Sequence, residues 1–172
     1  ILIRFMDDIY NPNTFTQIFF TDFSENIDGF KYDREHVTHV TDEKALRVAF
    51  KSDTQVTVEQ KVVMDLSAAA ELKVCFRFRP DDVKVGAELL VDLWDGTEWC
   101  TLRTLKNAPK RGHGDFSNQS TDYAYIRVGG DEVTFASDAK IRLCCEDSGD
   151  SGVILINDVG IYVLPNEPAG NR

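Results

Sequence analysis

The feature that most constrains this chain is the alternation of apolar and mainly polar side chains between Glu71 and Arg79. The apolar positions are Leu72, Val74, Phe76 and Phe78, and the positions between them are Lys73, Cys75, Arg77 and Arg79. Successive side chains of a β-strand point to opposite faces, so this spacing places the four apolar side chains together. A helix would scatter them around its axis. The stretch predicts a strand with one face in a core.

Similar short runs recur along the chain between turn-forming residues, at 17–23, 45–51, 54–63, 87–94, 98–105, 123–128, 140–145 and 153–164. In the 54–63 run, the spacing predicts that Val56, Val58 and Val62 share one face. Asp95-Gly96 predicts a tight hairpin, because glycine accepts the positive φ that such turns require. The alanine-rich run 65–70 is too short for an independent helix and predicts a single turn. This recurrence of short strand-like runs between turns is typical of an all-β protein.

The length of 172 residues fits one domain that can bury a two-layer core. We expect an N-terminal arm or edge strand at 1–16, a β-sandwich at 17–165 and a C-terminal tail at 166–172. The chain starts with Ile1 rather than Met and without a secretory signal, so we expect a processed or trimmed end.

Charge narrows the range of partners. The chain carries 19 basic and 29 acidic residues, a formal net charge of −10, and its basic residues are scattered. Nucleic acid is therefore not expected as a partner. The chain has no apolar run of about 18 residues, so we expect no membrane span.

Four cysteines, Cys75, Cys100, Cys144 and Cys145, fit neither a zinc pattern nor a redox motif. Adjacent residues of a strand face opposite ways, so Cys144 and Cys145 cannot both bond to one sheet partner. If a disulfide forms, we favour Cys75 with Cys100. The alternative is that all four are small buried apolar residues.

A set of short motifs, in a fixed order from about residue 20 to 164, resembles a known superfamily. The motifs are Asp22-Phe23, Gly29-Phe30, Asp65-Leu66-Ser67, the strand 72–76, Asp95-Gly96-x-x-Trp99 and Ile156-Asn157-Asp158-Val159-x-Ile161. This order is similar to that of the jelly-roll domains of MAM-like and carbohydrate-binding-module-like extracellular proteins. The resemblance implies a two-sheet antiparallel jelly-roll β-sandwich with an N-terminal extension, secreted or lumenal.

Many members of this superfamily hold a structural calcium between the opening and closing strands, and oxygen ligands suit that ion. Here Ser24 stands at the early acidic position with Glu25 one step along, and Asn157 replaces the first acid of the closing pair. The resemblance therefore leaves Asp22, Glu25 and Asp158 as candidate ligands for one structural calcium. Asp147 and Asp150 are a further acidic pair, for which ordinary turn chemistry is the favoured interpretation.

No enzyme motif is present, because the chain has no Gly-x-Ser-x-Gly elbow, phosphate loop or His-Glu-x-x-His. His36 and His39 are three apart and would face opposite ways in a strand, while His113 sits among loop residues. No pattern marks two carboxylates as a glycosidase pair. We expect a non-catalytic protein.

For a sugar ligand, the required parts are an exposed aromatic ring and nearby polar groups. The candidates are Trp94, Trp99, Tyr123 and Tyr125. Tyr123 and Tyr125 share one face of a strand, whether that face binds a ligand or is packed. The tryptophans flank the predicted hairpin and could instead cap the core, which is the outcome we expect for Trp99.

Two functions therefore remain in view. One is an extracellular module that binds carbohydrate or another cell-surface or matrix ligand. The other is a structural or adhesion protein that self-associates through sheet edges or the N-terminal arm. The sequon Asn118-Gln119-Ser120 agrees with secretion in either case.

Overall fold

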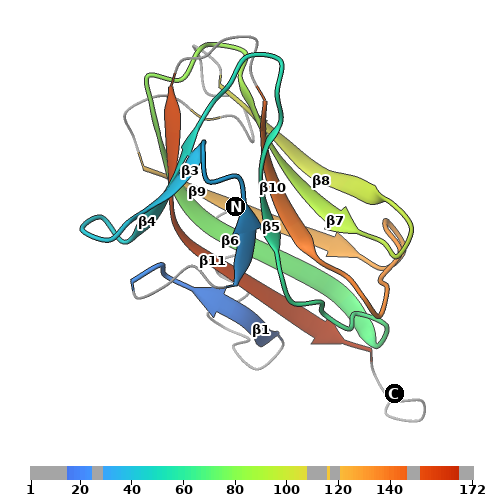
Figure 1. Ribbon diagram of the computed structural model, residues 1–172. Coiled ribbons are helices and arrows are strands. Elements are labelled where there is room, and N and C mark those ends of the chain that lie inside the picture. Colours follow the sequence, from blue (N-terminus) through green and yellow to red (C-terminus); the bar gives the residue numbers. More distant parts are fainter. Residues whose placement is uncertain (1–14, 25–28, 108–115, 117–120, 147–151, 167–172) are drawn as a thin grey trace.

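The computed structural model is described here for residues 15–24, 29–107, 116, 121–146 and 152–166. Two antiparallel β-sheets lie face to face as a jelly-roll sandwich (Figure 1). The strands are β1 (Thr16–Thr21), β2 (Phe30–Tyr32), β3 (Val37–Val40), β4 (Ala45–Ala49), β5 (Val56–Gln60), β6 (Ala69–Asp81), β7 (Glu88–Trp94), β8 (Trp99–Lys106), β9 (Asp122–Gly129), β10 (Ile141–Glu146) and β11 (Val153–Pro165). None of the described residues forms a helix that could cross a membrane.

The first sheet has the order β3-β4-β11-β6-β9, and the second has the order β2-β5-β10-β7-β8. The long strand β11 organises the first sheet. Its start pairs with β4, its later part pairs with β1, and β6 runs along its other edge (Figure 1). The predicted all-β jelly-roll class is confirmed.

The core lies between the sheets and contains the apolar face of β6 predicted from sequence. Leu72, Val74, Phe76 and Phe78 are each at most 2% exposed. The ring of Phe78 lies 5.5 Å from that of Phe76 and 5.6 Å from that of Phe116, measured between centroids. Such aromatic pairs add specific geometry to the stabilisation that comes from apolar burial.

The 54–63 run departs from its predicted pattern after Val58. Val56 and Val58 are buried, but Val62 is 66% exposed, because β5 ends at Gln60. Gln60 takes the inward position instead and is 1% exposed. Its side-chain Oε1 accepts a hydrogen bond from the backbone N–H of Ile141 at 3.1 Å. A buried polar side chain needs such a partner. With this hydrogen bond, Gln60 can occupy the last inward-facing position of β5 in place of an apolar residue.

The predicted turns are present where local chemistry specifies them. Asp95-Gly96 closes the β7–β8 hairpin, with Gly96 at a φ of +100° and the Asp95 N–H donating to the Glu98 carbonyl at 3.0 Å. Within the 65–70 run, the Ala69 N–H donates to the Leu66 carbonyl at 3.0 Å, and β6 begins at Ala69. A single turn therefore replaces a helix there.

The favoured disulfide is wrong. All four cysteines are free thiols. Cys75 lies on β6 of the first sheet and Cys100 on β8 of the second. Cys145 belongs to the core and Cys144 faces the other side of β10, as expected for adjacent residues of a strand. Burial raises the pKa of Cys144 to about 12, so this thiol stays protonated near neutral pH.

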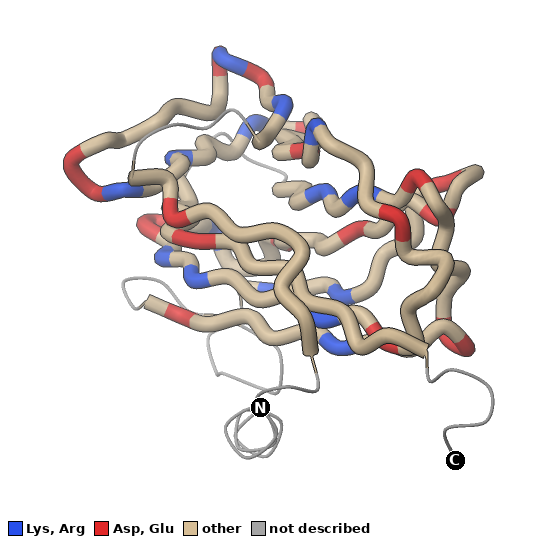
Figure 2. Tube along the Cα trace, turned by 90° about the horizontal axis from the view of Figure 1, so that it is seen from below, with Lys and Arg blue, Asp and Glu red and all other residues tan. Residues whose placement is uncertain are grey.

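Many of the acidic residues lie at turns between the strands (Figure 2). Charges within the sheets are often paired, for example Arg127 with Glu71 at 2.7 Å and Arg142 with Asp92 at 2.8 Å. Ion pairs therefore neutralise part of the charge on the sheets, although the chain as a whole is acidic. Of the predicted N-terminal arm, only Phe15 and Thr16 are described, and of the predicted tail only Asn166.

Candidate functional site

The candidate site lies on the side of the second sheet turned away from the core, called here the outer face. Trp94 ends β7 and Trp99 begins β8, and the hairpin register places them directly opposite each other. Their ring centroids are 5.5 Å apart with an interplanar angle of 63°, an edge-to-face pair. Neither tryptophan belongs to the core cluster and both are partly exposed. The expectation that Trp99 caps the core is therefore wrong.

The tryptophan pair borders a pocket of about 370 Å³. Its lining consists of Glu59, Val63, Trp94, Trp99, Asp138 and Lys140. Val63 is 53% exposed despite being apolar, and it stands at the edge of this pocket. The pocket thus combines an aromatic wall, an apolar edge and three charged groups, which is the mixture found in sites for small polar ligands.

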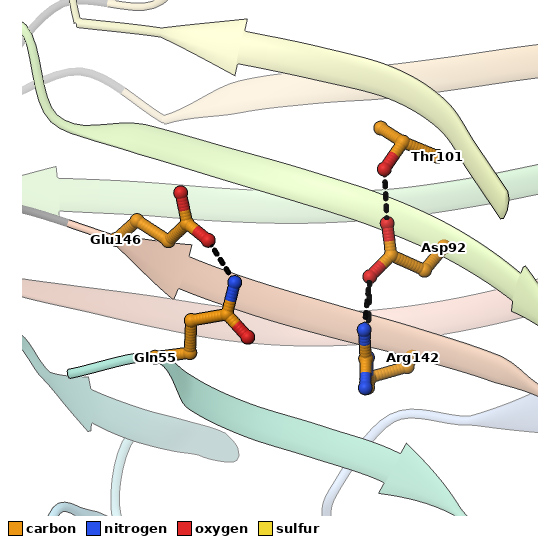
Figure 3. Close-up of polar contacts among 5 residues, drawn as sticks. All are labelled: Gln55, Asp92, Thr101, Arg142 and Glu146. Carbon is orange, nitrogen blue, oxygen red and sulfur yellow. Dashed lines mark hydrogen bonds and ion pairs between the residues drawn. The ribbon is translucent and has the colours of Figure 1, made fainter. Parts of the chain in front are cut away.

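A polar network of Asp92, Arg142 and Thr101 lies in the middle of the sheet (Figure 3). Asp92 on β7 is 3% exposed. Its Oδ2 accepts hydrogen bonds from Arg142 Nε at 3.1 Å and Nη2 at 2.8 Å, and its Oδ1 accepts one from Thr101 Oγ1 at 2.8 Å. The strand register places Arg142 and Thr101 on either side of Asp92. A carboxylate withdrawn from water is stable only when paired and hydrogen-bonded in this way.

The same arginine connects this network to the tryptophans. The guanidinium carbon of Arg142 lies 4.3 Å from the centroid of the Trp99 ring, within cation–π range. Lys140 Nζ lies 5.9 Å from that centroid and 3.1 Å from Glu59 Oε2. Each of the two cations near Trp99 therefore also has a carboxylate partner.

Towards the other end of the same face, Gln55 Nε2 donates a hydrogen bond to Glu146 Oε1 (Figure 3). Gln55 precedes β5, and Glu146 ends β10. Figure 3 shows that this contact and the Asp92 network lie along the same sheet. The outer face therefore carries polar side chains over much of its length, with the aromatic pair at one end.

The hairpin that carries the tryptophans is held by Asp95. Its Oδ1 accepts hydrogen bonds from the backbone N–H groups of Glu98 and Thr97, both at 2.8 Å, and from Thr97 Oγ1 at 2.9 Å. These bonds lower the pKa of Asp95 to about 2.

Asp95, Glu98 and Cys100 have potential metal-ligand atoms within 4.8 Å of one another. Cys100 Sγ donates to Asp95 Oδ2 at 3.3 Å, and burial raises the pKa of that thiol, so turn chemistry accounts for the cluster.

The two predicted tyrosines lie on the opposite side of the molecule. Tyr123 and Tyr125 both point outward from β9 in the first sheet, while Ala124 and Ile126 between and beside them are in the core. Tyr123 is 41% exposed, but Tyr125 is only 4% exposed. The structure therefore divides the four aromatic candidates between two faces.

Tyr125 is covered because it takes part in packing around Lys73, which is 6% exposed. Lys73 Nζ lies 4.7 Å from the ring centroids of Phe15 and Tyr162 and 5.5 Å from that of Tyr125. Three rings around one ammonium group stabilise its burial. Tyr125 therefore packs with Phe15 and Tyr162 around Lys73 on the outer side of the first sheet and offers no open platform.

The candidate calcium ligands have other partners where they are described. Asp22 Oδ1 accepts hydrogen bonds from Ser24 N at 3.0 Å and Ser24 Oγ at 2.6 Å. Asp158 Oδ2 lies 2.7 Å from Arg77 Nε, and its Oδ1 accepts the Arg77 N–H at 3.0 Å. Glu25 lies outside the described residues. The calcium site stays a prediction.

The remaining sequence candidates are dispersed. His36 Nδ1 lies 2.7 Å from Asp33 Oδ2, whereas His39 Nε2 lies 2.7 Å from the Phe23 carbonyl oxygen. The two imidazoles thus have separate partners. Asp33, Glu35 and His36 also place potential ligand atoms within 4.8 Å, at a largely exposed turn. His113, the Asn118 sequon, Asp147 and Asp150 lie outside the described residues.

Sequence reasoning missed the charged part of the site: Glu59, Asp92, Asp138, Lys140 and Arg142. One signal was present for Asp92, because it interrupts the apolar run Leu89–Leu93 as a charged residue. Its partner Arg142 is 50 residues away, so the pairing depends on how β10 docks beside β7.

Comparison with known proteins supports the fold. The sequence matches no family model, and no curated protein matches it significantly. Solved structures do match, among them BiXyn10A CBM1, with a TM-score of 0.59 and 13% identity over 88% of this chain and 99% of that chain. The CBM22-1 xylan-binding domain of Paenibacillus barcinonensis Xyn10C gives a TM-score of 0.54 and 11% identity over 88% and 97%.

TmCBM61, solved in complex with beta-1,4-galactotriose, gives a TM-score of 0.50 and 11% identity over 78% of this chain and 86% of that chain. All three matches are to carbohydrate-binding modules. The jelly-roll fold of this chain is thus similar to that of these carbohydrate-binding modules, in line with the fold that the resemblance of its motifs implies. At these identities the likeness is one of fold, and the site must be argued from this chain's own residues.

Proposed function

We propose that this protein is a non-catalytic carbohydrate-binding module, with its site at the Trp94 end of the outer face of the second sheet. The observation that carries the proposal is the pocket itself, in which a partly exposed aromatic pair meets charged hydrogen-bonding groups. The fold shared with carbohydrate-binding modules supports the same conclusion.

The chemistry of the pocket suits a sugar ring. A pyranose has an apolar face of C–H groups that packs on an indole, and hydroxyl groups at its edge that both donate and accept hydrogen bonds. Trp94 would supply the stacking surface. Glu59 and Asp138 would accept hydrogen bonds from hydroxyl groups, and Lys140 would donate to them. Val63 would contact the edge of the sugar.

The charges of the pocket favour binding over catalysis. Glu59 is held by Lys140 at 3.1 Å, and the nearby Asp92 is bonded on both oxygens. Carboxylates fixed in this way serve as acceptors and as supports for neighbouring side chains. We further propose that the module acts outside the cell, where polysaccharides and glycoproteins are accessible.

Affinity electrophoresis tests this proposal. The chain is run through gels that contain xylan, galactan, mixed-linkage glucan or mucin, with serum albumin as the non-binding reference. We expect retardation by at least one polysaccharide, and loss of that retardation in Trp94→Ala. Retardation by none of a broad panel, or equal retardation of the Trp94→Ala protein, would contradict the proposal.

A second candidate function, self-association, is favoured by one observation on β1. Among the described residues β1 pairs with β11 alone, and its Ile18 and Phe20 are 41% and 51% exposed. A strand edge with exposed apolar side chains can pair with a second copy. Light scattering over a concentration series tests this, with Phe20→Lys as the variant. A constant monomer mass would rule it out.

A further inference from the structure

We propose that Arg142 and Asp92 are positioning residues, which fix the ring of Trp99 so that Trp94 is the ring offered to the ligand. The positioning itself stands on contacts within this chain. Only its consequence for ligand affinity rests on the proposed function.

The first step is the fixed position of Asp92. It lies on β7, between β10 and β8 of the second sheet, and is 3% exposed. Both of its oxygens are hydrogen-bonded within the protein, one to Arg142 and one to Thr101. The carboxylate therefore has a single well-defined orientation, and it fixes the arginine that it holds.

The second step is the orientation of Arg142. Asp92 Oδ2 accepts from Nε and Nη2 of the same guanidinium, which holds this edge of the group. The side chain is 20% exposed and its guanidinium carbon lies 4.3 Å from the Trp99 centroid. A planar guanidinium can bond to a carboxylate at its edge while its face contacts a ring, whereas a lysine at position 142 would replace the two-point carboxylate contact and the flat ring contact with a single ammonium.

The third step is the division of roles between the tryptophans. The Trp99 ring is contacted by Arg142, with Lys140 Nζ 5.9 Å from its centroid, and is packed edge-to-face with Trp94. Trp99 is therefore engaged by protein groups. Trp94 also lines the pocket, and among the described residues it has no cation over its ring. Trp99, held in place by Arg142, supports the ring that a sugar would stack on.

The chain offers a spectroscopic test that needs no ligand. It contains only two tryptophans, so a tryptophan–tryptophan exciton couplet in its circular dichroism reports on the Trp94–Trp99 geometry. We expect Arg142→Lys and Asp92→Asn to lose most of this couplet. The matched control is Arg79→Lys on the first sheet, where Arg79 is 46% exposed and 3.4 Å from Glu43, and it should keep the couplet. Urea unfolding of each variant identifies any protein that is not folded.

The glycan retained in the electrophoresis panel is then titrated into the same proteins. We expect Arg142→Lys to bind about fivefold more weakly, a loss within the range of one solvent-accessible cation–π contact, and Arg79→Lys to bind like the wild type. A couplet unchanged in a folded Arg142→Lys protein overturns the positioning role. A lost couplet with unchanged affinity overturns the claim that Trp99 supports the binding ring. If the wild-type protein binds no glycan while Arg142→Lys loses the couplet, the positioning role holds and the proposed function fails.

Discussion

Thr101→Val is the substitution that probes the buried carboxylate with the least disturbance. Valine has nearly the same shape as threonine and an equal or better fit to a strand, so the main loss is one hydrogen bond. That bond runs from Thr101 Oγ1 to Asp92 Oδ1 at 2.8 Å, and the acceptor is 3% exposed. Any effect on stability therefore reports on how much Asp92 depends on this partner.

The magnitude follows from the burial of the two partners. A hydrogen bond to a charged group contributes about 1.5–3 kcal/mol. Thr101 itself is exposed, so water can partly replace its hydroxyl, and we take the lower end. We expect Thr101→Val to lower the free energy of unfolding by about 1.5 kcal/mol, which corresponds to a fall in Tm of roughly 3–6 °C for a domain of this size.

Urea unfolding followed by tryptophan fluorescence measures this difference. Thr104→Val is the matched control, because Thr104 lies on the same strand and is exposed, but it stands opposite Leu90 instead of Asp92. We expect the control to change stability by less than about 0.5 kcal/mol. If both variants have the same stability, Asp92 does not depend on Thr101, and the network described above is wrong at that point.

Three further predictions concern the hairpin, the core and the pocket edge. Hydrogen bonds lower the Asp95 pKa from 3.8 to about 2, so the stabilising effect of this carboxylate is present above pH 4 and lost as the pH falls towards 2. The Tm of Asp95→Asn should therefore drop less between pH 5 and pH 2 than the Tm of the wild type. An equal drop in the two proteins would refute this. Phe78→Ala should cost about 3–5 kcal/mol in urea unfolding, against less than about 1 kcal/mol for the exposed Tyr123→Ala, and similar costs would contradict the assigned core. Val63→Asp should weaken glycan binding in titration while stability changes by less than about 0.5 kcal/mol, since Val63 is already 53% exposed; unchanged binding would remove it from the site.

The fold was predictable where the pattern of side chains is local. The alternation of Leu72 to Phe78 defined β6, and Asp95-Gly96 defined the β7–β8 hairpin. The short strands β2 and β3 escaped notice because three or four residues carry too little periodicity. Val62 was misplaced because a buried Gln60, satisfied by the distant Ile141 N–H, ends the strand earlier than the valines suggest.

The site was predictable only in its aromatic half. Trp94 and Trp99 flank one hairpin, so their proximity could be inferred from a few neighbouring residues. Strand order determines the sheet to which Tyr123 belongs, and therefore also the separation of Tyr123 from the tryptophans. Likewise, the contact of Arg142 with both Asp92 and Trp99 arises from the register of three strands that are far apart in the sequence.

The central claim is that ligand binds at Trp94 on the outer face of the second sheet. Isothermal titration of the best-retained polysaccharide into the wild type, Trp94→Ala and Tyr123→Ala tests it most directly, because the two variants remove a partly exposed ring from opposite faces of the molecule. We predict that Trp94→Ala weakens binding about 30-fold or more, as expected for a central aromatic contact, and that Tyr123→Ala leaves it unchanged. Loss of binding in Tyr123→Ala with full binding in Trp94→Ala would place the site on the first sheet and contradict the account.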